Sequence, residues 1–248
     1  MFVICGGHVT QPIWSFLFSI QLQSTVWTQL LIKTDWCCFY LTVGCELTLD
    51  PDTVNGNLKL SDNNRKVELV RQYQPYPDHP DRFEFWQLLC KNGLTGRCYW
   101  EVEGEGVVQI AVTYRGISRT GYKDACGFGR NHLSWCLICF KEGFSVLHNQ
   151  SRAYYRLPAP SISSSSSFSN RVAVYVDHPA GTLSFYRISF GRLIHLHTFN
   201  TTFTEPLYAG FGFGSGALAG ASVSLCSLWK RDSLSAEKQT LLPERQLD

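Results

Sequence analysis

Apolar and polar residues alternate along positions 172–186, and this pattern predicts a β-hairpin. The apolar positions that would share one face are Val172, Val174, Val176, Leu183 and Phe185. The residues between the two runs include Asp, Pro and Gly, which favour turns. A hairpin accounts for the whole stretch without any catalytic group.

Similar short runs recur from residue 45 to residue 229. We expect further strands at 58–60, 67–70, 99–103, 107–114, 133–140, 144–147, 193–199, 207–213 and 221–229. Glycine-containing turns predict that 99–103 and 107–114 form one hairpin and that 133–140 and 144–147 form another. No long amphipathic helix interrupts these runs. The pattern therefore predicts an all-β fold, an antiparallel sandwich with little helix.

Residues 1–44 differ from this pattern, since they carry only two charged side chains, Lys33 and Asp35. Their start has no Lys or Arg, which is unlike a signal peptide. Polar residues interrupt the most apolar window, 13–32, so we expect no membrane span and no membrane partner. We expect residues 1–44 to be an apolar leader of uncertain order and residues 230–248 to be a charged C-terminal tail.

Charge and cysteine content narrow the class of protein. The chain carries 22 basic and 20 acidic side chains, and this balance predicts no nucleic-acid partner. Its ten cysteines have no regular spacing and several fall inside apolar strands, so we expect reduced thiols and a cytoplasmic location. Glycosylation sequons at Asn149 and Asn200 favour the opposite, a secreted chain.

Two pairs of residues could in principle bind a metal. Cys136 and Cys139 are three apart in a predicted strand, so their thiols should point to opposite faces and should not share a zinc ion. His195 and His197 are two apart and should share a face, but no third ligand is evident. We therefore expect no metal site.

Sequence motifs typical of enzymes are either absent or lie in the wrong structural context. The run Gly212-x-Gly214-x-x-Ala217 fits a dinucleotide fingerprint, but a strand follows where the nucleotide site needs a helix. The chain has no Gly-x-Ser-x-Gly motif, and no cysteine and histidine are singled out as a catalytic pair. We expect no cofactor and no enzyme activity.

Four motifs occur in a fixed order along the chain. They are Leu-Asp-Pro-Asp-Thr at 49–53, Tyr-Trp-Glu-Val-Glu at 99–103, the hairpin at 177–186, and the pair Leu-His-Thr-Phe at 196–199 with Glu-Pro-Leu-Tyr at 205–208. Together they resemble the PRY–SPRY (B30.2) domain. The proline-rich run at 74–80 is similar to those of fish tripartite-motif and NACHT-type (NOD-like) immune-receptor proteins.

The resemblance implies one B30.2 domain at 45–229, with a PRY segment at 45–97 and a SPRY segment at 98–229. It also implies a bent antiparallel β-sandwich of the concanavalin-like jelly-roll type. Such domains bind a protein or peptide through loops at one end, in innate immune sensing or the regulation of ubiquitination. The residues that match the binding loops are Glu84, Phe85, Trp86, Arg119, Tyr122, Asp124, Ile138, Phe140, Phe213 and Ser215.

The chain departs from the family pattern at several places near these loops. Gly104 and Gly106 follow the Tyr-Trp-Glu-Val-Glu motif at 99–103, His178 occupies the hairpin turn, and Gly212 and Gly214 stand where aromatic residues are common. The alternative function is that of a secreted or surface lectin-like sandwich that binds carbohydrate. Glycosylated sequons and oxidised cysteines would favour this alternative.

Overall fold

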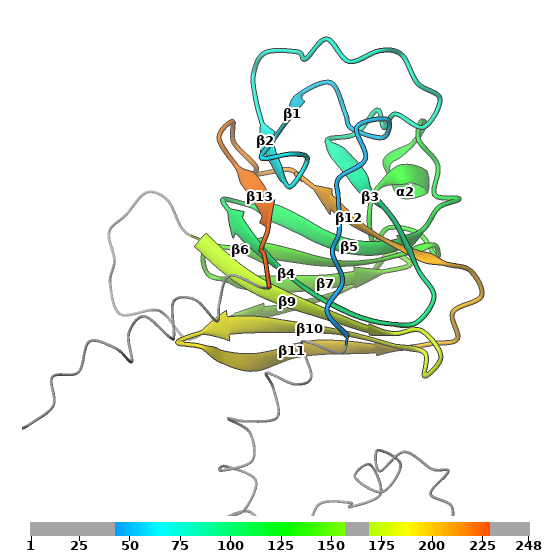
Figure 1. Cartoon of the computed structure of the whole chain (residues 1–248), viewed down its shortest axis with the longest axis vertical. Helices are drawn as coiled ribbons and strands as arrows, with labels where there is room; N and C mark the ends of the chain where they lie inside the picture. The colour runs from blue at the N-terminus through cyan, green and yellow to red at the C-terminus, as the bar shows by residue number, and fades with distance from the viewer. Residues whose placement is uncertain (1–42, 157–168, 229–248) are drawn as a thin grey trace, which may run out of the picture. The chain divides into compact units, whose positions relative to one another are not determined.

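The computed structural model describes residues 43–156 and 169–228. The predicted leader up to residue 42 and the predicted charged tail lie outside the described residues. The strands are β1 (Leu58–Ser61), β2 (Lys66–Leu69), β3 (Gln87–Leu94), β4 (Arg97–Glu105), β5 (Val108–Tyr114), β6 (Ser134–Phe140), β7 (Gly143–His148), β8 (Ser151–Arg156), β9 (Ser169–Asp177), β10 (Thr182–Ser189), β11 (Arg192–Asn200), β12 (Leu207–Gly212) and β13 (Ser222–Leu225). A short helix, α2 (Lys123–Cys126), lies beside β3 (Figure 1).

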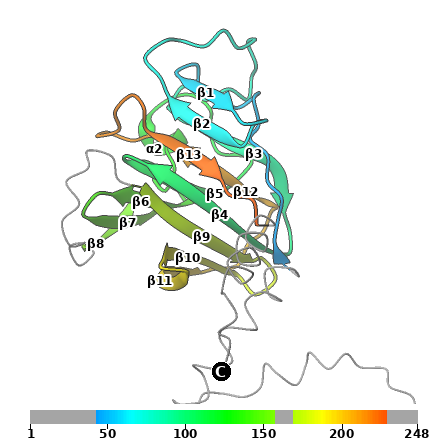
Figure 2. The same ribbon diagram turned by 60° about the vertical axis from the view of Figure 1, so that its left-hand side comes forward.

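The strands form two antiparallel sheets that pack face to face. One sheet has the order β1-β2-β13-β4-β9-β10-β11, and the other has the order β3-β12-β5-β6-β7-β8. In a turned view, β1 and β11 lie at opposite edges of the seven-stranded sheet (Figure 2). The predicted all-β sandwich is confirmed. No helix in the described part of the chain is long and apolar enough to cross a membrane.

The hairpin at 172–186 forms as predicted. β9 and β10 pair antiparallel, with Val174 opposite Phe185 and Val176 opposite Leu183. All four side chains are buried between the sheets. The hairpin of β6 and β7 is also confirmed, with Phe140 opposite Gly143 at its turn.

The predicted pairing of 99–103 with 107–114 is wrong. β4 already pairs with β13 on one side and β9 on the other, so it has no edge left for β5. The chain instead crosses to the other sheet, where β5 lies between β12 and β6. Gly106 has a φ of 76°, which lets the backbone turn there. A glycine-rich turn is compatible with either path, and only the available sheet edges decide between them.

Two strands have no clear alternation and were not predicted. β3 is covered on both faces where it begins, because Leu88 lies in the main core and Leu89 packs against the loops outside the sheet. β8 is a sheet edge whose sequence, Ser-Arg-Ala-Tyr-Tyr-Arg, contains only one small apolar residue besides its two tyrosines.

A disulfide joins Cys45 to Cys98, whose Cα atoms lie 5.5 Å apart. The expectation that all the thiols are reduced is therefore wrong at this pair. It links the segment before β1 to the start of β4, which are separated by 53 positions. Cys90, Cys126, Cys136 and Cys139 are free and buried.

Candidate partner-binding face

One row of residues crosses all six strands on the outer face of the six-stranded sheet. In order across β3, β12, β5, β6, β7 and β8, this outer row contains Gln87, Gly212, Gln109, Ile138, Ser145 and Tyr154. It faces away from the main core because its neighbours along the strands, such as Ile110 and Leu137, point inward. With strands about 4.8 Å apart, the row extends over roughly 24 Å.

The loops between β5 and β6 cover only part of this outer face. Phe128 and Ile117, together with Phe83, pack over the adjoining row that includes Leu89 and Cys136. Gln87 is held at the border of this cover, since its Nε2 donates to the Cys126 carbonyl at 2.5 Å. The outer row therefore begins where the loop cover ends.

Gln109 lies near the centre of the outer row, and its amide group packs against two glycines, Gly212 and Gly214. A Cβ built on Gly212 would lie 2.8 Å from Gln109 Oε1, and one built on Gly214 would lie 2.7 Å from Gln109 Nε2. The carboxamide is half-buried, and its donors and acceptor have no hydrogen-bond partner among the described residues. It can therefore pair with the backbone of a bound peptide.

Aromatic side chains border the row at both ends. Trp86 precedes β3 and is 42% exposed, while Tyr154 on β8 is 53% exposed. Phe140 is half-buried, and its ring centre lies 6.1 Å from that of Tyr154. Exposed aromatic side chains on a rigid sheet are typical anchors in protein interfaces.

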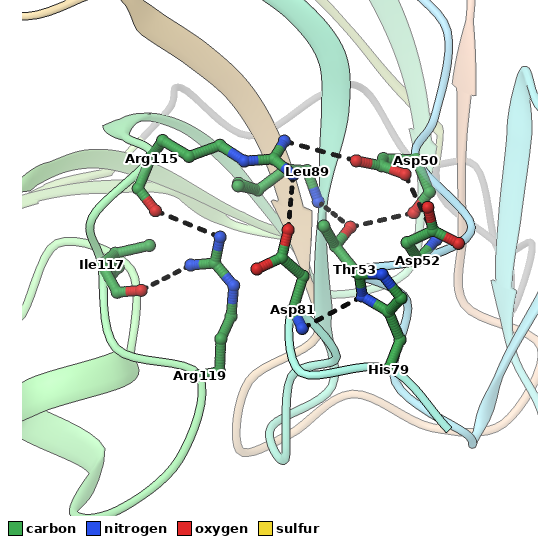
Figure 3. A network of polar contacts seen from close by, with 9 residues as sticks. All are labelled: Asp50, Asp52, Thr53, His79, Asp81, Leu89, Arg115, Ile117 and Arg119. Atoms are coloured by element: carbon green, nitrogen blue, oxygen red, sulfur yellow. Dashed lines mark hydrogen bonds and ion pairs between the residues drawn. The ribbon is translucent and has the colours of Figure 1, made fainter. Parts of the chain in front are cut away.

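A polar network fixes the loop after β5 to the PRY segment (Figure 3). The Arg115 guanidinium donates to the Asp81 carboxylate at 2.6 Å and to the Asp50 carboxylate at 3.3 Å. Thr53 donates to the Asp50 carbonyl and accepts the Leu89 N–H, which ties the network to β3. Segments far apart in sequence are thereby held beside one another, and the loop that carries Arg119 and Tyr122 starts from a fixed position.

Arg119 forms its hydrogen bonds within its own loop, and its role in partner binding stays a prediction. Its guanidinium donates to the carbonyls of Ile117 and Arg115 and lies 4.5 Å from the ring centre of Phe83. Burial lowers the pKa of Arg119, and the nearby positive charge of Arg115 acts in the same direction. These bonds leave Arg119 as a support for the loop.

The two predicted acidic residues are also engaged locally. Glu84 Oε2 accepts the Gly121 N–H at 3.0 Å, and the Glu84 N–H donates to the Arg119 carbonyl at 2.9 Å. Asp124 forms an ion pair with Arg130 at 3.4 Å. Both carboxylates remain exposed, so they shape the edge of the face where α2 lies.

The structure separates the ten predicted binding residues by exposure. Glu84, Trp86, Tyr122, Asp124 and Ser215 are exposed, and Phe85, Arg119 and Phe140 are half-buried. Ile138 and Phe213 are only 7% and 5% exposed. Phe213 belongs to the main core, so it supports the face from below, with its N–H bonded to the Trp86 carbonyl.

Sequence reasoning missed three residues of the face: Gln109, Arg152 and Tyr154. Gln109 is a polar residue inside an apolar run, which is a signal for an outward position. Arg152 and Tyr154 lie on β8, which was not predicted. Their membership in the face depends on register across four strands, which no local pattern contains.

The cysteine pair of β6 behaves as its spacing predicts. Cys136 packs under the loop cover and Cys139 packs in the main core, so their thiols lie on opposite faces. Burial raises the pKa of Cys136 and of Cys90, and it raises the pKa of Cys139 to about 12. At neutral pH these thiols stay protonated and are poor nucleophiles.

His195 and His197 do not share a strand face, contrary to prediction. A bulge in the pairing of β10 with β11 places His197 opposite the buried Phe185 and His195 opposite Tyr186. His197 therefore packs inward, 4.4 Å from Phe199 between ring centres. His195 bonds Thr198 Oγ1 at 2.8 Å on the other face.

Comparisons with known proteins agree with this geometry. Residues 47–94 match the model of PRY, the SPRY-associated domain, and residues 97–225 match the SPRY domain model. Stonustoxin subunit beta from Synanceia horrida is 40% identical over 172 residues, which are 68% of this chain and 23% of the toxin subunit. Tripartite motif-containing protein 16 from Mus musculus is 34% identical over 69% of this chain and 30% of its own length.

A solved structure has the same architecture. The crystal structure of the TRIM65 PSpry domain superposes with a TM-score of 0.65 at 27% identity, and the match covers 83% of this chain and all of that one. The chain spans about a quarter of the toxin subunit that it matches. The motifs had not suggested a toxin relative, and the likeness to NACHT-type receptors stays a prediction. The two matching models and the shared sandwich show that this chain belongs to the PRY–SPRY family.

Proposed function

We propose that this chain is a non-catalytic module that binds a protein or peptide on the outer row of its six-stranded sheet. The observation that carries the proposal is the outer row itself, in which the half-buried Gln109 and the exposed Tyr154 lie on one face of a rigid sheet, with the exposed Trp86 next to Gln87 at the start of β3. SPRY domains are typically non-catalytic binding modules, which supports the same conclusion. A row of this length on a rigid sheet suits an extended peptide.

The relatives suggest a setting for this binding. We infer a role in innate immune sensing or in the regulation of ubiquitination, supported by similarity to tripartite motif-containing proteins 16 and 14. We also propose a cytoplasmic location. Trapping of free thiols with a thiol reagent while the cells are denatured tests it. A cytoplasmic chain should then be labelled at Cys45 and Cys98, whereas a pair that is labelled only after reduction would indicate an oxidising compartment.

Affinity capture with the full chain tests the binding function. The exposed Trp86 and the half-buried Phe140 are each changed to alanine, and Phe190→Ala is the matched control because Phe190 is fully exposed in the turn between β10 and β11 of the other sheet. We expect a captured protein to bind the purified wild type and the control equally. Loss of an interface anchor should weaken this binding by about fivefold or more. Equal binding by all four proteins would refute the assignment of the face.

A carbohydrate-binding function is the second candidate, favoured by the Cys45–Cys98 disulfide and by the exposure of both sequon asparagines. Asn149 lies in the turn between β7 and β8, and Asn200 ends β11. Glycan-array binding by the full chain, retained in Trp86→Ala, would support this candidate over the first.

A further inference from the structure

An arginine on the outer face of the six-stranded sheet is held in place without an acidic partner. Arg152 on β8 lies opposite Leu147, next to the outer row. Its Nε and Nη2 donate to the buried Ser145 Oγ at 3.4 and 3.3 Å. Its guanidinium carbon lies 5.9 Å from the ring centre of Phe140. Within the described residues it forms no ion pair.

Two other arginines near this face already have acidic partners. Arg115 is bound by Asp50 and Asp81, and Arg130 is paired with Asp124. Arg130 and Arg152 both act electrostatically on Cys136, which lies on the same outer face of the sheet. Of these two arginines, only Arg130 has an acid within ion-pair distance in the described part of the chain, which leaves the positive charge of Arg152 uncompensated there at the β7–β8 side.

The orientation of Arg152 suits it for binding a carboxylate. A guanidinium has five N–H donors, and two long bonds to one hydroxyl leave the others available. Because Ser145 and Phe140 already restrict the side chain, a ligand has less conformational entropy to remove. Guanidinium and carboxylate groups can form paired, charge-assisted hydrogen bonds in a fixed plane.

We propose that the outer row binds an extended acidic peptide of a partner protein, and that Arg152 binds the carboxylate of an Asp or Glu side chain in it. This inference rests on the proposed protein-binding function. Charge complementarity at Arg152 determines the acidic character of the peptide. Gln109 is placed to bond the peptide backbone, and Tyr154 and Phe140 supply apolar contact beside the charge.

Selection from a random peptide library on the full chain tests the proposal. We expect the peptides retained by the wild type to carry an Asp or Glu at one shared position. Replacing that residue by Asn or Gln should weaken binding about tenfold or more. Arg152→Gln should weaken binding of the acidic peptides by a similar factor and leave binding of the neutral versions unchanged. Arg152→Lys should retain part of the affinity because it keeps the charge.

Arg192→Gln is the matched control, since Arg192 is an exposed arginine on β11 in the other sheet. Urea unfolding of each variant verifies that the domain is folded. Selected peptides without a shared acidic position, or acidic peptides that bind Arg152→Gln as tightly as the wild type, would overturn the proposal. If such peptides still depended on Trp86, the proposed function would stand while the role of Arg152 failed. Retention of no peptide would overturn both.

Discussion

Alanine substitutions at two neighbouring glycines of β12 should separate the stability of the domain from partner binding. Gly210 and Gly212 both face outward on the same strand, but they lie against different neighbours. An added Cβ at Gly210 would lie 2.7 Å from the Phe128 ring and 3.1 Å from Leu89 Cδ2. At Gly212 the nearest atom is the end of the flexible Gln109 side chain, at 2.8 Å.

The expected magnitudes follow from what must move. Phe128 belongs to the loop cover and is 1% exposed, so Gly210→Ala overpacks a buried ring at a cost of about 1–3 kcal/mol. Reduced freedom of the unfolded chain offsets about 0.4–1 kcal/mol of this. We expect a net loss of about 1–2 kcal/mol, or a fall in Tm of about 2–8 °C. Gly212→Ala should change the free energy of unfolding by less than about 0.5 kcal/mol, because the Gln109 amide can rotate away.

Peptide binding should be affected in the opposite order, so that Gly212→Ala weakens it more than Gly210→Ala does. Displacing the Gln109 amide removes one hydrogen bond to a bound peptide, which corresponds to about 0.5–1.5 kcal/mol, or about two- to twelvefold in Kd. Urea unfolding and binding of peptides selected on the wild-type chain measure the two effects. Gly96→Ala is the control, because its added Cβ would have no neighbour within 4 Å. Equal destabilisation by both substitutions, or unchanged peptide affinity in Gly212→Ala, would refute this reasoning.

Three further predictions concern the disulfide, a histidine and the buried thiols. Replacing Cys45 and Cys98 together by serine should lower the free energy of unfolding by about 2–4 kcal/mol under oxidising conditions; a urea midpoint equal to that of the oxidised wild type would contradict this. Burial, helped by the positive charge of His195, lowers the pKa of His197, so the unfolded state takes up this proton first as pH falls. The wild type should therefore lose stability between about pH 7.5 and about pH 5.5 to a greater extent than His197→Gln, as urea midpoints would show. Iodoacetamide at neutral pH should leave Cys136 and Cys139 unlabelled until urea unfolds the domain, and mass spectrometry that finds rapid labelling of the native chain would contradict their burial.

Local sequence patterns determined the elements that have one buried and one solvated face. The alternation in 172–186 predicted the β9–β10 hairpin, because a period of two decides which side chains face the core. The spacing of Cys136 and Cys139 determined that their thiols diverge. The four ordered motifs indicated the family, which the family models confirm, and the same resemblance predicts binding loops that carry Trp86 and Tyr122.

Only the tertiary structure decided which surface those elements form. Whether β4 continues into a hairpin or crosses to the other sheet depends on the occupied edges of β4, which lie far away in sequence. A single bulge against β10 reversed the expected relation of His195 and His197. The outer row joins residues of six strands through register, so long-range pairing places Gln109 on β5 and Arg152 on β8 on the same face of the sheet. Local periodicity reports which face a residue occupies, but it contains no information about which strands pair across the sheet.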